Sequence, residues 1–337
     1  MDIKTLTRRL PFIIVIISLI VVTHYYIALF TPSGQGTVPV IVEFEQGAGF
    51  RKIVNILNEK GLVRDKTAFL LLARLKGSTK SIHAGEYEFN ASMSPARILE
   101  KLEKGLVVKH PITIPEGYNV KEIAELLENA GLSHKGRFLV KSLDNEFLSS
   151  LGIDAYSVEG YLFPDTYYLT KGMTEEAIIT QMTARFREVF TDKMKMRAKE
   201  VGLSLAEVVT LASIVEKETG AASERPLIAR VFLNRLKKGI MLQSDPTVIY
   251  GIKDFNGNIT KNDLLADTPY NTYRRRGLTP GPIANPGLES LKAVLYPEDC
   301  QYLYFVSRND GTHYFSKTLS EHNMAVRQYQ IKKQKSK

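Results

Sequence analysis

An uncharged apolar run near the start of the chain limits its possible folds more than any other sequence feature. Residues 12–30 read FIIVIISLIVVTHYYIALF and contain no Asp, Glu, Lys or Arg. A helix needs about 20 such residues to cross the hydrocarbon core of a membrane. Lys4, Arg8 and Arg9 precede the run, and basic residues favour the cytoplasmic side. We therefore expect a single-pass anchor in the cytoplasmic (inner) membrane, with the N-terminus in the cytoplasm and the folded part extracytoplasmic or periplasmic.

The alternative interpretation of this run is a cleaved signal peptide. The run is longer than the apolar region of most signal peptides, and no cleavage site with small residues follows it. The sequence therefore favours an uncleaved anchor through residues 12–30.

Composition excludes several classes of protein. The chain has 337 residues, 44% of them hydrophobic, which allows about two domains with buried cores. Cys300 is the only cysteine, so no intrachain disulfide holds the fold. The net charge is +9, but an exported chain without a base-stacking motif is not expected to bind nucleic acid. The six histidines lack metal-ligand spacing, so we expect no metal and no cofactor.

Two segments of the chain share one pattern, a strand followed by a glycine turn and a helix. Residues 42–62 and 112–132 align at a constant spacing of 70 positions, which pairs Gly47 with Gly117 and Gly61 with Gly131. Two copies do not make a solenoid. The pattern fits either a duplication or two uses of one motif.

We predict an α+β fold with five parts. These are a cytoplasmic N-terminus (1–11), a transmembrane anchor (12–30), a Gly/Ser/Pro linker (31–37), a small β-α-α-β-α domain (38–107) and a larger mixed catalytic domain (108–337). The small domain has no cluster of acids, histidines or cysteines, so it favours binding or spacing over chemistry.

Capping residues mark several helices of the larger domain. Ser204 and Glu207 form an S-x-x-E capping box at the start of an apolar helix that ends before Gly220. Further helices are expected to begin at Ser223, at Asn285–Pro286 and at Ser320. Asn309-Asp-Gly, between residues 302–306 and 313–315, indicates a hairpin.

Two carboxylates near the end of the helix after Ser204 are candidate acids. Because successive helical positions turn by about 100°, Glu216 and Glu218 cannot both face one cleft. Glu218 lies in the last turn, where the helix dipole disfavours a negative charge and so favours a proton. A general acid needs that proton near neutral pH. The ordinary alternative is a solvated surface glutamate.

Eight segments of the chain, in this order, resemble the endolytic murein transglycosylase (YceG-like) family. They are GYLFPDTY, ASIVEKET, SER, FLNRL, LQSDPTVIYG, YNTY, GLTPGPIANPG and YLYFV. The resemblance covers nearly the whole chain, and LQSDPTVIYG after ASIVEKET is its most specific part. One departure is that Tyr161 and Phe163 stand where the family often has tryptophan, and the chain has no Trp.

The resemblance implies an enzyme that cuts peptidoglycan glycan strands internally and leaves 1,6-anhydro-muramyl ends. Glu218 is the residue that matches the family's catalytic glutamate, and the small domain is similar to a LysM-like module. By this resemblance Glu218 first protonates the leaving glycosidic oxygen and then takes the proton of the C6 hydroxyl, so no second carboxylate has to position a water, unlike in ordinary glycosidases. The implied partners are glycan strands and peptidoglycan synthases of the elongation or division machinery.

Polar and aromatic residues around the two motifs are the candidate sugar-binding groups. Each also has an ordinary interpretation as a turn or core residue. The candidates are Glu159, Asp165, Tyr167, Gln243, Asp245, Thr247, Asn271 and Tyr273.

Two other functions fit the same residues. In a hydrolytic muramidase, Glu218 is the acid and Asp245 is the second carboxylate that activates water. In the other alternative, the protein is a non-catalytic, membrane-tethered scaffold that binds peptidoglycan.

Overall fold

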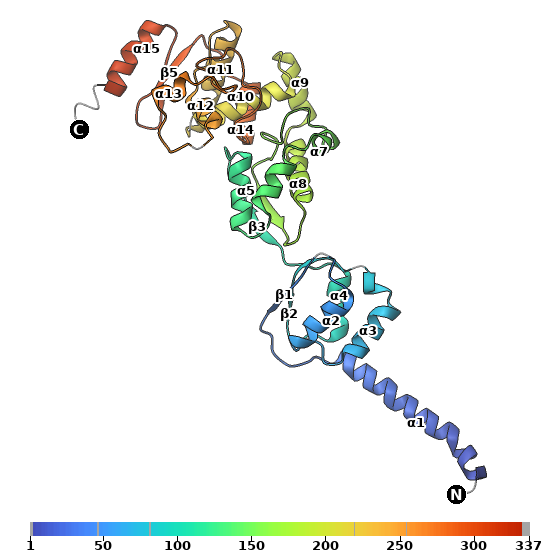
Figure 1. Cartoon of the computed structure of the whole chain (residues 1–337). Coiled ribbons are helices and arrows are strands. Elements are labelled where there is room, and N and C mark those ends of the chain that lie inside the picture. The colour runs from blue at the N-terminus through green and yellow to red at the C-terminus, as the bar shows by residue number, and fades with distance from the viewer. Residues whose placement is uncertain (1–2, 46, 81, 219, 254, 332–337) are drawn as a thin grey trace. The chain divides into compact units, whose positions relative to one another are not determined.

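The computed structural model describes residues 3–45, 47–80, 82–218, 220–253 and 255–331. The chain forms two compact units with mixed helices and strands (Figure 1), which confirms the α+β part of the prediction. The first unit extends to His110 and includes residues 168–173, and the second comprises Pro111–Tyr167 and the chain from Thr174 onward. The sequence did not predict that residues 168–173 belong to the first unit. An ion pair holds them there, because Nζ of Lys171 lies 2.5 Å from Oε1 of Glu86.

The first helix, α1 (Ile3–Phe30), contains the apolar run. Its segment Leu10–Phe30 has a mean hydropathy of 2.5 and is largely exposed. Within the described part of the chain, it is the one helix long and apolar enough to cross a membrane. A signal sequence meets the same criteria, so these properties fit an anchor or a signal sequence.

The small unit has the predicted β-α-α-β-α order. Strand β1 (Val40–Phe44) pairs antiparallel with β2 (Gly85–Phe89), and Val42 lies opposite Tyr87. The helices are α2 (Phe50–Glu59), α3 (Lys66–Leu75) and α4 (Pro95–Glu103), with a 3-10 turn at Ser78–Lys80. The Ser94 hydroxyl accepts a hydrogen bond from the backbone N–H of Arg97 and caps α4.

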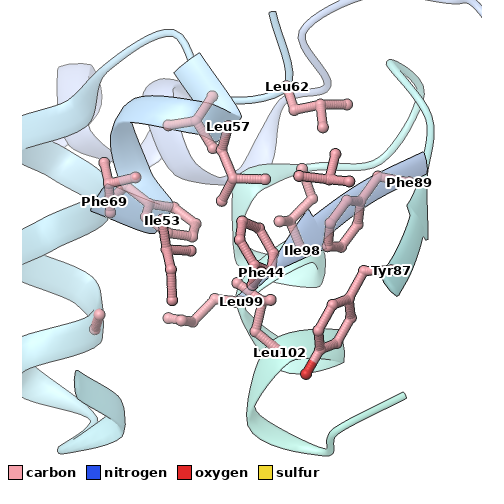
Figure 2. Packing of buried hydrophobic residues seen from close by; sticks show 14 residues of the cluster. Phe44, Ile53, Leu57, Leu62, Phe69, Tyr87, Phe89, Ile98, Leu99 and Leu102 are labelled. Carbon is pink, nitrogen blue, oxygen red and sulfur yellow. The ribbon is translucent and has the colours of Figure 1, made fainter. Parts of the chain in front are cut away.

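Side chains from both strands and from the helices form the core of this unit (Figure 2). Phe44 packs against Tyr87 with ring centroids 5.7 Å apart, and Tyr87 stacks on Phe89 at 5.8 Å. Leu57 of α2 is fully buried among them. Alternate strand residues and one helix face thus supply the apolar surface whose burial stabilises the unit.

Both predicted strand–turn–helix segments are present in the structure. The second consists of β3 (His110–Thr113) and α5 (Val120–Asn129), whose helix lies 70 positions after α2. Gly47 and Gly117 have φ angles of 80° and 77°, and Gly61 and Gly131 have 71° and 66°. These left-handed conformations favour glycine, which explains the repeated glycines in the sequence.

The second unit is mainly helical. Beyond α5 its helices are α6 (Lys135–Lys141), α7 (Asn145–Ser150), α8 (Glu175–Val189), α9 (Asp192–Glu200), α10 (Leu205–Glu218), α11 (Arg225–Lys237), α12 (Asp245–Gly251), α13 (Lys261–Leu265), α14 (Leu288–Leu295) and α15 (Leu319–Val326). A 3-10 turn at Ala222–Glu224 and a π-helical turn at Arg327–Ile331 complete them. Strand β3 pairs with β4 (Thr166–Leu169), and β5 (Tyr304–Ser307) pairs antiparallel with β6 (His313–Ser316), which confirms the predicted hairpin.

Helix α10 lies at the centre of the second unit and contacts α9, α11, α12 and α14. All eight residues from Val208 to Val215 are buried, so the helix has apolar neighbours on every side. The predicted capping box is present, because the Glu207 N–H donates to the Ser204 hydroxyl and the Glu207 carboxylate accepts from the Ser204 N–H.

Three other predicted helix starts are wrong. Ser223 lies in the 3-10 turn, and α11 begins at Arg225. The cap of α15 is Thr318, which forms a capping box with Glu321 that Ser320 cannot form. Asn285 does not start α14, because its side chain bonds distant backbone groups instead.

The core of the small unit gives a stability prediction. Replacing Leu57 with Ala should lower its free energy of unfolding by about 2–5 kcal/mol, because a buried cavity is left behind. Leu75→Ala, at a side chain that is 78% exposed, should change it by less than about 0.5 kcal/mol. Hydrogen–deuterium exchange resolved by peptide measures the small unit separately. Equal loss of protection in both variants would contradict the packing described above.

Candidate active site

The two glutamates at the end of α10 lie in different surroundings, as their helical spacing requires. The Glu216 carboxylate accepts a 2.8 Å bond from Nη2 of Arg225 and a 2.9 Å bond from the backbone N–H of Gly287. The Glu216 and Arg225 side chains are only 5% and 11% exposed. Lys217, between the glutamates, donates from Nζ to the Gly117 carbonyl at 3.1 Å. These bonds fix the end of the helix and give Glu216 a structural role.

Glu218 instead lines a cavity of about 330 Å³ in the second unit. The other residues that line it come from α11, α15, β5 and the segments around α12 and residue 273. They are Arg235, Leu242, Gln243, Asp245, Tyr273, Phe305 and His322. Most of these side chains are polar or charged, and Tyr273, Phe305 and His322 add rings. A concave cavity of this size is typical of a ligand site.

Burial raises the pKa of Glu218 to about 7, and the nearby charge of Asp245 acts in the same direction. A hydrogen bond from the Ser244 hydroxyl and the charge of Arg235 partly oppose this rise. Ser244 itself is almost fully buried. A carboxyl with this pKa is about half protonated at neutral pH, so it can give a proton to a ligand in the cavity and take one back.

Arg235 places a fixed positive charge in the same cavity. Its Nε donates to the Leu303 carbonyl at 2.6 Å and its Nη1 to the Leu242 carbonyl at 2.6 Å. The guanidinium lies over the Tyr304 ring, 5.1 Å from its centroid, in cation–π geometry. Because Arg235 is only 8% exposed, these bonds hold it in one position.

Four of the predicted site residues are brought together by the structure. Gln243, Asp245 and Tyr273 line the cavity with Glu218. The Tyr273 hydroxyl donates a 2.6 Å hydrogen bond to Oδ1 of Asp245. Gln243 has a φ of 52°, a left-handed conformation that is strained for a residue with a side chain.

Thr247 and Asn271 do not line this cavity. Both are fully buried, and Thr247 donates to the Ser244 carbonyl at 2.7 Å. Asn271 donates from Nδ2 to the carbonyls of residues 263, 264 and 266 at 3.3, 3.0 and 2.7 Å. The two side chains therefore hold the loops that carry Ser244 and Tyr273.

Glu159 also does not line the cavity. It is only 3% exposed and accepts bonds from the Val120 N–H, the Tyr250 hydroxyl at 3.1 Å and Nδ2 of Asn285 at 3.0 Å. Burial raises its pKa to about 8. Asn285 in turn accepts a 2.9 Å bond from the Leu162 N–H. Glu159 thus belongs to a buried network that joins distant segments of the unit.

Asp165 and Tyr167 lie outside the cavity as well. Asp165 accepts a 2.7 Å bond from Nε of Arg185. Tyr167 is buried and its hydroxyl donates to the Phe163 carbonyl. Their partners are protein groups, and nothing in their position points to a sugar.

Sequence reasoning missed Arg235, Ser244, Phe305 and His322. Arg235 had a usable signal, since it continues the spacing of the buried residues Ile228, Val231 and Phe232 on α11. Arginine on a buried helix face is rare unless it is paired, so this position marks a special environment. Phe305 and His322 come from the C-terminal elements, and no local pattern connects them to Glu218.

The comparisons with known proteins identify the family of this chain. A model of the YceG-like family matches residues 42–328. A Bacillus subtilis (strain 168) protein named endolytic murein transglycosylase is 33% identical over 305 residues, which cover 86% of this chain and 84% of that protein. A Streptococcus pneumoniae protein of the same name is 31% identical over 86% of this chain, which spans 58% of that longer protein.

A solved structure gives the same assignment. The 2.6 Å crystal structure of a YceG-like protein from Listeria monocytogenes superposes with a TM-score of 0.59 and 34% identity, covering 86% of this chain and 99% of that one. The chain belongs to the YceG-like family.

Because the two glutamates have different surroundings, we expect a Glu→Gln substitution to change the stability of the protein differently at the two positions. Glu216→Gln leaves the buried Arg225 without its main counter-charge and should cost about 3 kcal/mol of unfolding free energy. The cost should not be larger, because the Glu116 carboxylate lies 3.7 Å from Arg225. Glu218→Gln is the matched control and should not destabilise the fold at pH 8. Denaturant unfolding of both variants measures the difference, and a Glu216→Gln protein as stable as wild type would contradict the structural role.

The raised pKa of Glu218 predicts a pH-dependent stability difference. The folded protein binds this proton more tightly than the unfolded chain, whose pKa is near 4.5. The stabilisation present below pH 4.5 is therefore lost as the pH rises through about 7. Between about pH 5 and pH 8, wild type should lose about 1–3 kcal/mol relative to Glu218→Gln. The comparison isolates Glu218, because Glu159 is present in both proteins, and parallel unfolding curves across this range would refute it.

Proposed function

We propose that this protein is an endolytic murein transglycosylase that cleaves MurNAc–GlcNAc β-1,4 bonds within glycan strands and leaves 1,6-anhydroMurNAc ends. One observation carries this proposal: the Glu218 carboxyl, whose pKa burial raises to about 7, lines a cavity with polar and aromatic walls. The names of the relatives from B. subtilis and S. pneumoniae support the same substrate class.

The proposed reaction needs one acid that becomes a base. Protonated Glu218 gives its proton to the glycosidic oxygen while the bond from C1 to that oxygen breaks and an oxocarbenium-like centre forms. The C6 hydroxyl of the same sugar then bonds to C1, and the Glu218 carboxylate accepts the hydroxyl proton. The carboxyl ends as it began, and no water is consumed.

Two neighbours of Glu218 fit this cycle. The Ser244 hydroxyl donates to the carboxyl, and this bond strengthens when Glu218 becomes a carboxylate, since charge-assisted bonds are stronger. Arg235 is held nearby by backbone carbonyls and favours the same charged state. Burial favours the protonated state, so the two states are close enough in free energy to alternate.

Asp245 keeps a hydrolytic alternative open, because its carboxylate lines the same cavity. In a muramidase it activates a water that attacks C1, as the second carboxylate of an inverting glycosidase does. Asp245 already accepts a bond from the Tyr273 hydroxyl, which supports a role in shaping the cavity and holding sugar hydroxyls. We propose that role, together with Gln243 and Tyr273, as the sugar-contacting set.

We also propose that the protein works from the outer face of the cytoplasmic membrane. Helix α1 is long and apolar enough for an anchor, and Lys4, Arg8 and Arg9 favour a cytoplasmic N-terminus. An anchor keeps the catalytic unit close to strands as synthases extend them, so cleavage there limits strand length. We further propose that the small unit is a LysM-like module that binds glycan.

Product masses test the proposed reaction. Wild type should release fragments of uncrosslinked glycan that are lighter by one water per cut than hydrolysis products. Glu218→Gln should lower the rate at least about 100-fold, the usual contribution of a general acid. Asp245→Asn is the matched variant, and it should still give the lighter products. Fragments that carry the added water, together with their loss in Asp245→Asn, would support the muramidase instead, and binding without any cleavage would support a scaffold.

A further inference from the structure

His322 lines the cavity that contains Glu218, yet the proposed reaction gives it no role. It lies on α15, whose start is fixed by the capping box of Thr318 and Glu321. Its ring stacks on Tyr304 at 5.3 Å with an interplanar angle of 27°. Tyr304 also lies under the Arg235 guanidinium. The imidazole plane is therefore fixed beside the acid by packing.

The ring nitrogens of His322 have unused hydrogen-bonding capacity. Nδ1 is buried and has no hydrogen-bond partner in the structure. Among the described residues with a buried, unbonded side-chain nitrogen or oxygen, His322 is the one that lines this cavity. Buried polar groups nearly always have a partner, and each exception needs an explanation. His322 as a whole is only partly buried, so a ligand in the cavity meets the exposed edge of the ring, and Nδ1 reaches that edge when the ring turns over within its plane.

The protonation state of His322 suits a sugar. Burial lowers the pKa of His322 below its ordinary value, and the positive charge of Arg235 acts in the same direction. The ring is therefore neutral at neutral pH, with one N–H donor and one lone-pair acceptor. A sugar hydroxyl also donates and accepts, and an acetamido group offers an N–H and a carbonyl.

We propose that His322 is a substrate-contacting residue whose imidazole hydrogen-bonds a hydroxyl or acetamido group of the sugar held beside Glu218. The proposal rests on the proposed function in one respect, that the ligand is an amino-sugar glycan. His322 lies about 100 residues after Glu218 in the sequence, but it lines the same cavity because α15 and β5 pack together. Its fixed ring plane makes it a pre-organised contact.

Binding to an inactive protein tests this contact without cleavage. The full-length Glu218→Gln protein is titrated with soluble, uncrosslinked chains of alternating GlcNAc and MurNAc. Adding His322→Phe keeps an aromatic ring on Tyr304 but removes both nitrogens. Affinity should fall about 2- to 10-fold, the effect of one hydrogen bond. His322→Gln keeps a donor and an acceptor and should retain most of the affinity, and Asn323→Ala, at an exposed neighbour on α15, should bind as the parent does.

A second measurement does not depend on how the Phe variant folds. In the Glu218→Gln protein, the imidazole Cε1–H resonance of His322, assigned by its absence in His322→Gln, should shift when glycan is added. An unshifted resonance, or a His322→Phe protein that binds glycan as tightly as its parent, would overturn the proposal. Failure of the proposed function would appear elsewhere, as wild-type products that carry an added water or as no cleavage, while glycan still contacts His322.

Discussion

The ion pair between Glu216 and Arg225, completed by the Gly287 N–H, fixes the end of α10. Because residues 208–215 of this helix are buried, its last turn cannot rotate without breaking these bonds. The adjacent Lys217 adds a bond to the Gly117 carbonyl. Glu218 is thereby turned toward the cavity on the other side. Glu216 thus fixes the end of the helix, while Glu218 is left able to bind and release a proton near neutral pH.

The cavity itself depends on side chains that bond to backbone groups of distant loops. Arg235 bonds to the Leu242 and Leu303 carbonyls, and Asn271 bonds to three carbonyls at the end of α13. Such bonds satisfy backbone groups that burial would otherwise leave unpaired. They also keep the cavity in one shape before a ligand arrives, which lowers the cost of ordering a site on binding.

Local signals explain where sequence reasoning was right. The small unit follows its apolar periodicity, and the turns at Gly47 and Gly117 follow from left-handed backbone that glycine adopts freely. Reasoning was wrong where two local signals competed. At α15 both Thr318 and Ser320 are possible caps, and only Thr318 has a glutamate at the third position of the helix. Asn285 resembles a cap in sequence, but its amide bonds Leu162 and Tyr118 instead.

The sequence by itself determined the α+β elements, the apolar N-terminal helix and the fact that Glu216 and Glu218 must point apart, because these depend on neighbours a few positions away. Only the tertiary structure decided which glutamate lines a cavity, which polar residues surround it and which are buried in networks. That decision depends on burial and on partners such as Ser244, Gly287 and His322, which the fold brings together from far along the chain. The spacing of two residues in a helix fixes the angle between their side chains, but it does not show which groups surround each side chain.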